Sequence, residues 1–276
     1  MRQDGRVTSA TSDIDVALAA AAAGAAVVRA AYGAEHIRYA KIGSDFATET
    51  DIAAENAIFA VIEAARPDDA RIGEESGRAD GSNARRWLVD PLCGTLNFAA
   101  QTPLMAVNVA LADDDSTVAA VSIDPISGEI FWTDGERAFV RRDGVDVPLT
   151  PSPLSGLVDI DCDAPLDSAF VGGQLVADQA FRAAFGVRVS STTLTVAWAA
   201  AGRRAAYVSD GTFLDNVHFA AGIAISRAAG CVVTDFAGAE VESGRGLIVA
   251  ADAATHERIV RLIGPHLRDG SQERGL

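Results

Sequence analysis

Cysteine is scarce in this chain of 276 residues, and the three cysteines present, Cys93, Cys162 and Cys231, lie far apart. An odd number of widely spaced cysteines excludes the disulfide framework of a small secreted domain. It is typical of a protein kept in a reducing compartment. We therefore expect a cytoplasmic protein.

Basic residues are also few, since 23 Lys and Arg stand against 38 Asp and Glu, for a formal net charge of -15. Binding to nucleic acid or to an anionic membrane surface needs a basic face. The charge balance argues against both classes of partner. An anionic substrate would need a metal ion or local cations to draw it in.

Long hydrophobic runs are missing apart from one alanine-rich segment, residues 16–31. Arg29 interrupts this segment, acidic residues stand directly before it, and alanine is a weak residue for membrane insertion. We interpret it as part of a packed helix over residues 12–33 that begins with a capping box. The polar residues 1–11 before it show no hydrophobic period and are predicted to be disordered.

The sequence does contain enough apolar material for a sizeable core, because 49% of its residues are hydrophobic and 22% are charged. Residues 12–150 are predicted to form an α+β half, with two helices followed by short strands and an antiparallel meander over residues 104–147. Residues 151–276 are predicted to form an α/β half of alternating strands and helices. Its predicted strands are 157–161, 204–208, 231–235 and 247–250, and its predicted helices are 176–185, 194–202, 217–230 and 253–267.

One stretch of the first half, residues 86–95, combines features that suit chemistry. A short apolar run ends in Asp90, turns at a proline and a glycine and delivers Thr95, which indicates a strand that leads into a tight polar loop. The Asp90 carboxylate, the Leu92 carbonyl and the Thr95 hydroxyl suit Mg²⁺ and a phosphate oxygen. Asp-Pro and Gly-Thr are also common turn material, so an ordinary strand-to-turn junction is the alternative interpretation.

Four separated segments together form a further pattern. They include a lysine-containing loop, paired glutamates and the central stretch. They are Lys41 to Asp51, Ile72-Gly73-Glu74-Glu75-Ser76, Asp90-Pro91-Leu92-Cys93-Gly94-Thr95, and Val217 to Gly222 followed by Ala229 to Asp235. Their order and spacing over residues 13–267 resemble the motif set of the inositol monophosphatase-like superfamily of metal-dependent, lithium-sensitive phosphatases. The resemblance implies a layered αβαβα sandwich, with α+β and α/β halves, that forms a homodimer.

The resemblance also implies a first metal site for Mg²⁺ or Mn²⁺, formed by Glu74, Asp90, the Leu92 carbonyl and Thr95. In the family, a water on this metal attacks the phosphorus of a phosphate ester. The resemblance implies that Thr95 activates this water and that Asp51 orients the threonine hydroxyl.

Four residues are thereby expected to be catalytic: Lys41, Asp51, Glu74 and Thr95. The resemblance further implies that the backbone amides of Gly94 and Thr95 hold the phosphate oxygens of the substrate.

The chain departs from the family at two positions that carry aspartates of the second metal site, where it has Cys93 and His218. A thiol and an imidazole beside Asp90 disfavour Mg²⁺ and suit Zn²⁺ or Fe²⁺, which gives one interpretation, a repurposed metal site. The second interpretation is loss of that metal, with Cys93 a small buried hydrophobe and His218 a satisfied histidine. A nucleophilic Cys–His pair is the third.

The substrate side is altered as well, and Ser191, Asp210 and Arg188 are the candidate substrate contacts. Their polar groups fit a polyol or nucleotide-like ligand, although the hydroxyls in this segment are also suited to capping a helix. We expect a divergent metal-dependent phosphomonoesterase that acts on a small phosphorylated polyol, sugar or nucleotide. The alternative is a non-hydrolytic relative, either a pseudo-phosphatase that binds a phosphorylated ligand or an enzyme diverted to other chemistry.

Overall fold

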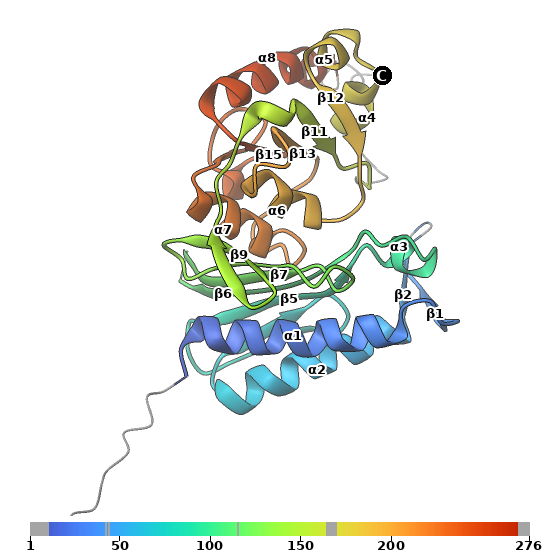
Figure 1. Ribbon diagram of the computed structural model, residues 1–276, viewed down its shortest axis with the longest axis vertical. Coiled ribbons are helices and arrows are strands. Elements are labelled where there is room, and N and C mark those ends of the chain that lie inside the picture. The colour runs from blue at the N-terminus through green and yellow to red at the C-terminus, as the bar shows by residue number, and fades with distance from the viewer. Residues whose placement is uncertain (1–10, 42, 44, 115, 164–169, 270–276) are drawn as a thin grey trace, which may run out of the picture.

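The computed structural model describes residues 11–41, 43, 45–114, 116–163 and 170–269 (Figure 1). Most of the N-terminal segment that we predicted to be disordered, residues 1–10, lies outside this range. The helices are α1 (Asp13–Ala31), α2 (Glu49–Ala65), α3 (Thr95–Ala99), α4 (Val171–Ala177), α5 (Gln179–Ala184), α6 (Leu194–Ala200), α7 (Ala220–Ala229) and α8 (Ala253–Asp269), with 3₁₀ turns at Pro153–Ser155 and Val241–Ser243.

The first half contains an eight-stranded sheet in the order β10-β9-β8-β7-β6-β5-β3-β4. Its strands are β3 (Ala70–Gly73), β4 (Gly77–Ala79), β5 (Arg86–Cys93), β6 (Ala106–Asp113), β7 (Ser116–Ile123), β8 (Ile130–Thr133), β9 (Ala138–Arg142) and β10 (Val145–Pro148). Neighbouring strands are antiparallel except for the parallel pair β3 and β5, so the predicted meander is confirmed. A separate hairpin of β1 (Arg38–Ala40) and β2 (Phe46–Thr48) precedes α2.

The second half contains a five-stranded mixed sheet in the order β12-β11-β13-β15-β14. Its strands are β11 (Leu157–Ile160), β12 (Gly186–Val189), β13 (Ala206–Ser209), β14 (Val232–Thr234) and β15 (Leu247–Ala250). β11 is parallel to both of its neighbours, and the other pairs are antiparallel. The edge strand β12 was not predicted from the sequence.

The helices and sheets stack in five layers (Figure 1). α1 and α2 cover one face of the eight-stranded sheet, and α6 and α7 lie between the two sheets. α4, α5 and α8 cover the outer face of the five-stranded sheet. Four apolar clusters fill the spaces between successive layers. The predicted αβαβα sandwich is confirmed.

Helix α1 has the length and apolar composition of a membrane span, and it is the one helix of the described residues that does. Ala17, Ala20 and Val28 on one of its faces are fully buried in the cluster that α1 shares with α2 and the sheet. Ser12 caps its first turn, because its hydroxyl accepts a hydrogen bond from the Asp15 backbone. The packed face agrees with the interpretation as a core helix.

Candidate active site

Strand β5 brings the central stretch to one end of the eight-stranded sheet. Asp90 pairs with Asn108 of β6 and Cys93 pairs with Ala106, so three residue steps on β5 face two on β6. This extra residue is a β-bulge, which re-aims the side chains at the end of the strand. The predicted polar loop after Asp90 was therefore wrong, since β5 runs on to Cys93. The strand tolerates Pro91, which has no N–H, because the pairing with β3 has already ended at Val89.

Gly94 makes the turn from β5 into α3. Its φ of 101° lies in the left-handed region that favours glycine. A Cβ atom at this position would lie 3.0 Å from the Leu104 carbonyl oxygen and 3.3 Å from the Ser191 carbonyl oxygen. Glycine is therefore required by conformation and by space, and Ser191 of the second half lies against the turn.

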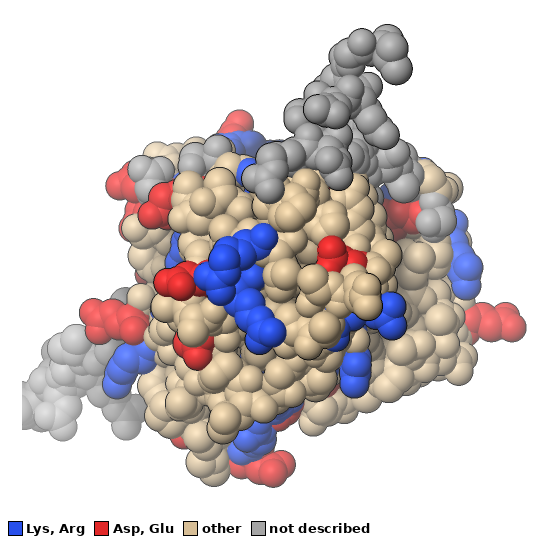
Figure 2. Space-filling view, turned by 90° about the horizontal axis from the view of Figure 1, so that it is seen from above, with Lys and Arg blue, Asp and Glu red and all other residues tan. Residues whose placement is uncertain are grey.

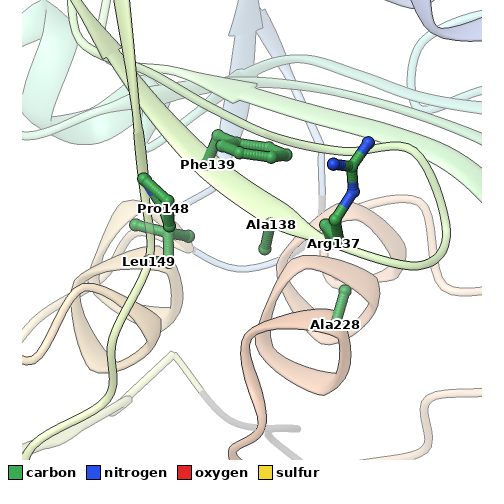
Figure 3. Close-up of a pocket in the computed structure, with 6 residues that line it drawn as sticks. All are labelled: Arg137, Ala138, Phe139, Pro148, Leu149 and Ala228. Carbon is green, nitrogen blue, oxygen red and sulfur yellow. The ribbon is translucent and has the colours of Figure 1, made fainter.

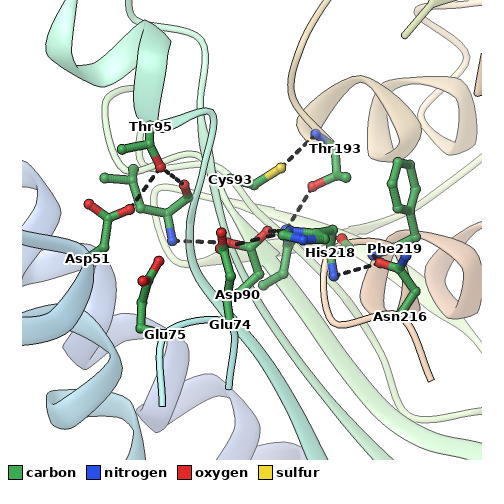
Figure 4. A network of polar contacts seen from close by, with 12 residues as sticks. Asp51, Glu74, Glu75, Asp90, Cys93, Thr95, Thr193, Asn216, His218 and Phe219 are labelled. Carbon is green, nitrogen blue, oxygen red and sulfur yellow. Dashed lines mark hydrogen bonds and ion pairs between the residues drawn. The ribbon is translucent and has the colours of Figure 1, made fainter. Parts of the chain in front are cut away.

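Thr95, the first residue of α3, is held against Asp51 of α2 (Figure 4). Its hydroxyl lies 2.8 Å from Asp51 Oδ1 and 3.1 Å from the Leu92 carbonyl oxygen, and its single proton can be donated to one acceptor at a time. The other carboxylate oxygen, Asp51 Oδ2, accepts hydrogen bonds from the Thr48 N–H and hydroxyl and closes the capping box of α2. Burial raises the pKa of Asp51, and the hydrogen bonds from Thr48 and Thr95 act against this rise.

Glu74, Asp90 and His218 converge at the end of the sheet (Figure 4). In the described part of the chain, they are the one group of three or more His, Cys, Asp and Glu side chains that could hold a metal ion, and their ligand atoms all lie within 4.8 Å of one another. His218 Nδ1 lies 2.8 Å from Asp90 Oδ2 and 3.9 Å from Glu74 Oε2. Two carboxylates and an imidazole nitrogen form a donor set that fits a divalent cation.

Lys41 supplies a positive charge on the other side of Glu74. Its Nζ lies 2.6 Å from Glu74 Oε1 and 2.8 Å from Glu75 Oε1. Burial lowers the pKa of Lys41, but the two glutamates outweigh burial and leave the pKa raised, so the ammonium group stays charged. Burial and the charge of Asp90 raise the pKa of Glu74, whereas His218 and Lys41 act in the opposite direction.

His218 is fixed through its backbone by two asparagines. Its N–H donates to Asn216 Oδ1 at 3.0 Å, and its carbonyl oxygen accepts from Asn108 Nδ2 at 3.4 Å. Burial lowers the pKa of His218, but Asp90 and Glu74 outweigh burial and raise it to about 9. The imidazole therefore faces Asp90 as a cation at neutral pH unless a metal ion displaces the proton on Nδ1.

Cys93 points away from this cluster, towards Thr193 (Figure 4). Its Sγ accepts a hydrogen bond from the Thr193 N–H at 3.2 Å. Burial, with the nearby charge of Asp90, raises the pKa of the Cys93 thiol well above its usual value, so the thiol stays protonated. A neutral thiol is a poor metal ligand and a poor nucleophile. The structure thus places His218 in the cluster and leaves Cys93 outside it.

The three predicted substrate contacts have different surroundings. Ser191 lies beside the Gly94 turn, where its carbonyl oxygen accepts from Asn97 Nδ2 at 3.2 Å. Arg188 stands on the edge strand β12 and donates to the Val187 carbonyl oxygen. The Asp210 side chain is buried and forms an ion pair with Arg245 at 2.8 Å. Only Ser191 is thereby tied to the central stretch, and the substrate role of all three stays a prediction.

A separate hollow of about 270 Å³ lies between β9, β10 and the end of α7 (Figure 3). Phe139, Leu149 and Ala228 give it a largely apolar lining, with Arg137 at its rim. Ala228 is near the carboxyl end of α7, whereas His218 precedes the amino end of that helix. The hollow is therefore not part of the cluster around His218.

Four residues that hold the site were not predicted as site residues: Thr48, Asn108, Thr193 and Asn216. Two of them leave a signal in the sequence. Thr48 stands three residues before Asp51, the spacing of a capping box. Asn108 interrupts the apolar run of β6, and a buried polar residue needs a partner, which it finds in Thr193 Oγ1 at 2.7 Å. Thr193 acts through tertiary contacts that no local pattern predicts, whereas Asn216 acts locally, because its Oδ1 accepts from the N–H groups two and three residues further on.

Comparison with known proteins identifies the family of this chain. The sequence model of the inositol monophosphatase family matches residues 9–268. The chain belongs to the inositol monophosphatase family. It is 32% identical over 230 residues to an inositol-1-monophosphatase of Caulobacter vibrioides, covering 80% of this chain and 88% of that protein. It is also 32% identical over 263 residues to the Nus factor SuhB of Vibrio cholerae, covering 91% and 93% of the two chains.

Solved structures of inositol monophosphatase relatives have the same fold. The extragenic suppressor protein suhB of Bartonella henselae superposes with a TM-score of 0.80 at 27% identity, covering 90% of this chain and 97% of that one. A Thermotoga maritima IMPase gives a TM-score of 0.78 at 22% identity, covering 93% and 98%. The resemblance inferred from the four segments is confirmed, and membership of the inositol monophosphatase family supports a phosphatase-type function.

Proposed function

We propose that this protein is a divergent metal-dependent phosphomonoesterase that acts on a small phosphorylated polyol, sugar or nucleotide. The observation that carries the proposal is the pairing of a cation-binding cluster, Glu74, Asp90 and His218, with the oriented Thr95–Asp51 hydrogen bond at the end of one strand. A cation held by the cluster would supply positive charge for a phosphate, and the Thr95–Asp51 hydrogen bond orients the hydroxyl oxygen that accepts a proton from water.

The chemistry of the donors supports Mg²⁺ or Mn²⁺ held by Glu74, Asp90 and the Leu92 carbonyl. Such an ion supplies Lewis acidity, which lowers the pKa of a water molecule and neutralises charge on a phosphate ester. Zn²⁺ or Fe²⁺ shared by Cys93 and His218 is disfavoured, because the Cys93 thiol is protonated and turned towards Thr193.

The chain itself orients the proton acceptor. Thr95 donates its one proton to Asp51, which leaves lone pairs of the hydroxyl oxygen available to accept a hydrogen bond from an attacking water. Asp51 is held in place by the N–H and hydroxyl of Thr48, so the geometry is set before substrate arrives. The backbone amides of Gly94 and Thr95 are the proposed donors to the phosphate oxygens.

The proposed partner is a small phosphorylated substrate, in a cytoplasmic protein that forms a homodimer as the family resemblance implies. A nucleic acid or an anionic membrane is not a proposed partner, because the net charge is -15. On the face seen in Figure 2, Lys and Arg form small groups beside Asp and Glu within a mostly uncharged surface.

Two substitutions of Thr95 test this function with p-nitrophenyl phosphate and a panel of inositol, sugar and nucleoside monophosphates, by release of inorganic phosphate. Thr95→Val removes the hydroxyl at nearly constant volume and is expected to lower kcat on the order of 10²–10⁴-fold. Thr95→Ser is the matched control, because it keeps the hydroxyl and should retain most of the activity. Equal activity of wild type and Thr95→Val with every substrate would contradict the proposal.

A second candidate is a non-hydrolytic relative that binds a phosphorylated ligand without cleaving it. One observation favours it: Lys41 and His218 already lie 2.6 Å and 2.8 Å from the carboxylates of Glu74 and Asp90 and neutralise them without an added ion. This candidate predicts phosphate-ester binding by calorimetry, no phosphate release and no effect of Thr95→Val on binding.

A further inference from the structure

Three donor atoms from two halves of the chain face one another at the end of the sheet. They are Glu74 Oε2, Asp90 Oδ2 and His218 Nδ1, with the nitrogen 3.9 Å and 2.8 Å from the two oxygens. The three side chains come from the end of β3, from β5 and from the segment before α7. Their convergence is therefore a product of the tertiary fold.

The remaining oxygen of each carboxylate has a partner of its own. Asp90 Oδ1 accepts from the Leu92 N–H at 3.1 Å, and Glu74 Oε1 accepts from Lys41 Nζ at 2.6 Å. These contacts leave Asp90 Oδ2 and Glu74 Oε2 as the atoms directed to His218. Outer partners of this kind hold ligand atoms in a fixed direction in metal sites.

The backbone of His218 is held independently of the carboxylates. Asn216 Oδ1 accepts from the N–H groups of both His218 and Phe219, and Asn108 Nδ2 donates to the His218 carbonyl oxygen. The His218 side chain is 39% exposed, whereas the Asp90 side chain is fully buried. The cluster is thus anchored on the protein side and open on the side of His218, as a catalytic metal site is.

We propose that His218 is a metal ligand through Nδ1 and that the Glu74–Asp90–His218 site selects a transition-metal ion over Mg²⁺. Mg²⁺ prefers oxygen ligands, whereas an imidazole nitrogen raises the affinity for ions later in the series from Mn²⁺ to Zn²⁺. The inference rests on the metal site of the proposed function, adds His218 as a ligand and narrows the ion from Mg²⁺ or Mn²⁺ to a transition-metal ion. Cys93 has no part in this site.

A spectroscopic measurement on the full chain tests ligation without using activity. The wild-type protein, stripped with a chelator and loaded with Mn²⁺, is expected to show ¹⁴N modulation from a coordinated imidazole in pulsed electron paramagnetic resonance. Incorporation of ¹⁵N-histidine should replace the ¹⁴N signal, so this readout needs no variant. Mn²⁺ bound without any nitrogen coupling would overturn the proposal and leave an all-oxygen site.

Substitution of the ligand tests selectivity by titration calorimetry with Mn²⁺, Zn²⁺ and Mg²⁺. His218→Asp replaces the neutral imidazole nitrogen by an anionic carboxylate oxygen, and it should shift the ratio of affinities towards Mg²⁺ on the order of tenfold or more. His256→Gln is the matched control, because His256 contacts Thr234 outside the cluster and the ratio should not change. An unchanged ratio in His218→Asp would overturn the proposal.

The failure of the inference and the failure of the proposed function give different results. Phosphate release that depends on Mg²⁺, without nitrogen coupling to Mn²⁺, overturns the inference alone. Nitrogen coupling without phosphate release in any metal overturns the phosphatase function and supports the ligand assignment. Absence of binding by all three ions overturns both.

Discussion

The Asp51 carboxylate serves two groups with its two oxygens. Oδ2 caps α2 through Thr48, and Oδ1 accepts the proton of Thr95. Asp51→Asn has one oxygen and one amide, so it cannot accept from both sides. We expect the free energy of unfolding to fall by about 1–3 kcal/mol and kcat to fall on the order of 10²–10⁴-fold. Urea denaturation and phosphate release measure the two effects.

The control for this prediction is Ser12→Ala, which removes the cap of α1. Ser12 accepts from the Asp15 backbone and has no contact with the site. Its loss should cost about 1 kcal/mol of stability and leave kcat unchanged. If Asp51→Asn also lost only stability, Thr95 would not depend on Asp51 for its orientation.

At the scale of elements, the turn between β5 and α3 depends on Gly94. Gly94→Ala would place a methyl group at φ 101° and 3.0 Å from the Leu104 carbonyl oxygen. Gly33→Ala is the matched control, since Gly33 has φ 88° but no atom within 4 Å of the added Cβ. We expect a loss of about 1 kcal/mol for Gly33→Ala and a clearly larger loss for Gly94→Ala. Equal losses in urea denaturation would show that the close approach carries no cost.

The sequence predicted elements well where one periodicity runs through them and poorly where contacts set their ends. Helix α6 and strand β11 begin at the predicted residues, Leu194 and Leu157. The helix predicted over 176–185 is instead α4 and α5, which meet at Asp178, because this residue ends one helix and caps the next. The bulge in β5 was missed because its pairing with β6 is not visible in local composition.

The site was predictable to the extent that it lies in short motifs. Thr95 contacts Asp51, and Glu74 lies with Asp90, while the catalytic and metal-binding roles of these residues stay predictions. The separation of Cys93 from His218 was not predictable, because it depends on which side of the bulged strand the thiol faces.

At the scale of the molecule, Glu129 joins the two halves. It stands before β8, and its carboxylate accepts from Arg203 Nη1, which follows α6, at 2.7 Å and from Arg142 of β9. Glu129→Gln is expected to lower the free energy of unfolding at pH 7 by about 1–3 kcal/mol. The control Glu63→Gln breaks an exposed pair with Arg71 inside one half and should cost under about 1 kcal/mol. Equal costs in urea denaturation would contradict a linking role.

The Glu129–Arg203 pair also predicts that the stability of the fold depends on pH. Hydrogen bonding to Arg203 lowers the pKa of Glu129 below its ordinary value of 4.5, against the effect of burial. A lowered folded pKa gives stability that is present above the unfolded pKa and is lost as pH falls through the folded pKa. Wild type should therefore lose more stability than Glu129→Gln as the pH falls from about 5 to about 3. Parallel acid profiles in thermal melts would refute this.

The convergence of Asp90 and His218 joins positions that are 128 apart in the chain. Synthesis proceeds from the N-terminus, so a nascent chain that ends in β10 already contains Glu74 and Asp90 but lacks His218, whose imidazole faces them. Until residue 218 has emerged, Glu74 has Lys41 as a neighbouring positive charge. The cation site is consequently completed only after the whole of the first sheet has been synthesised.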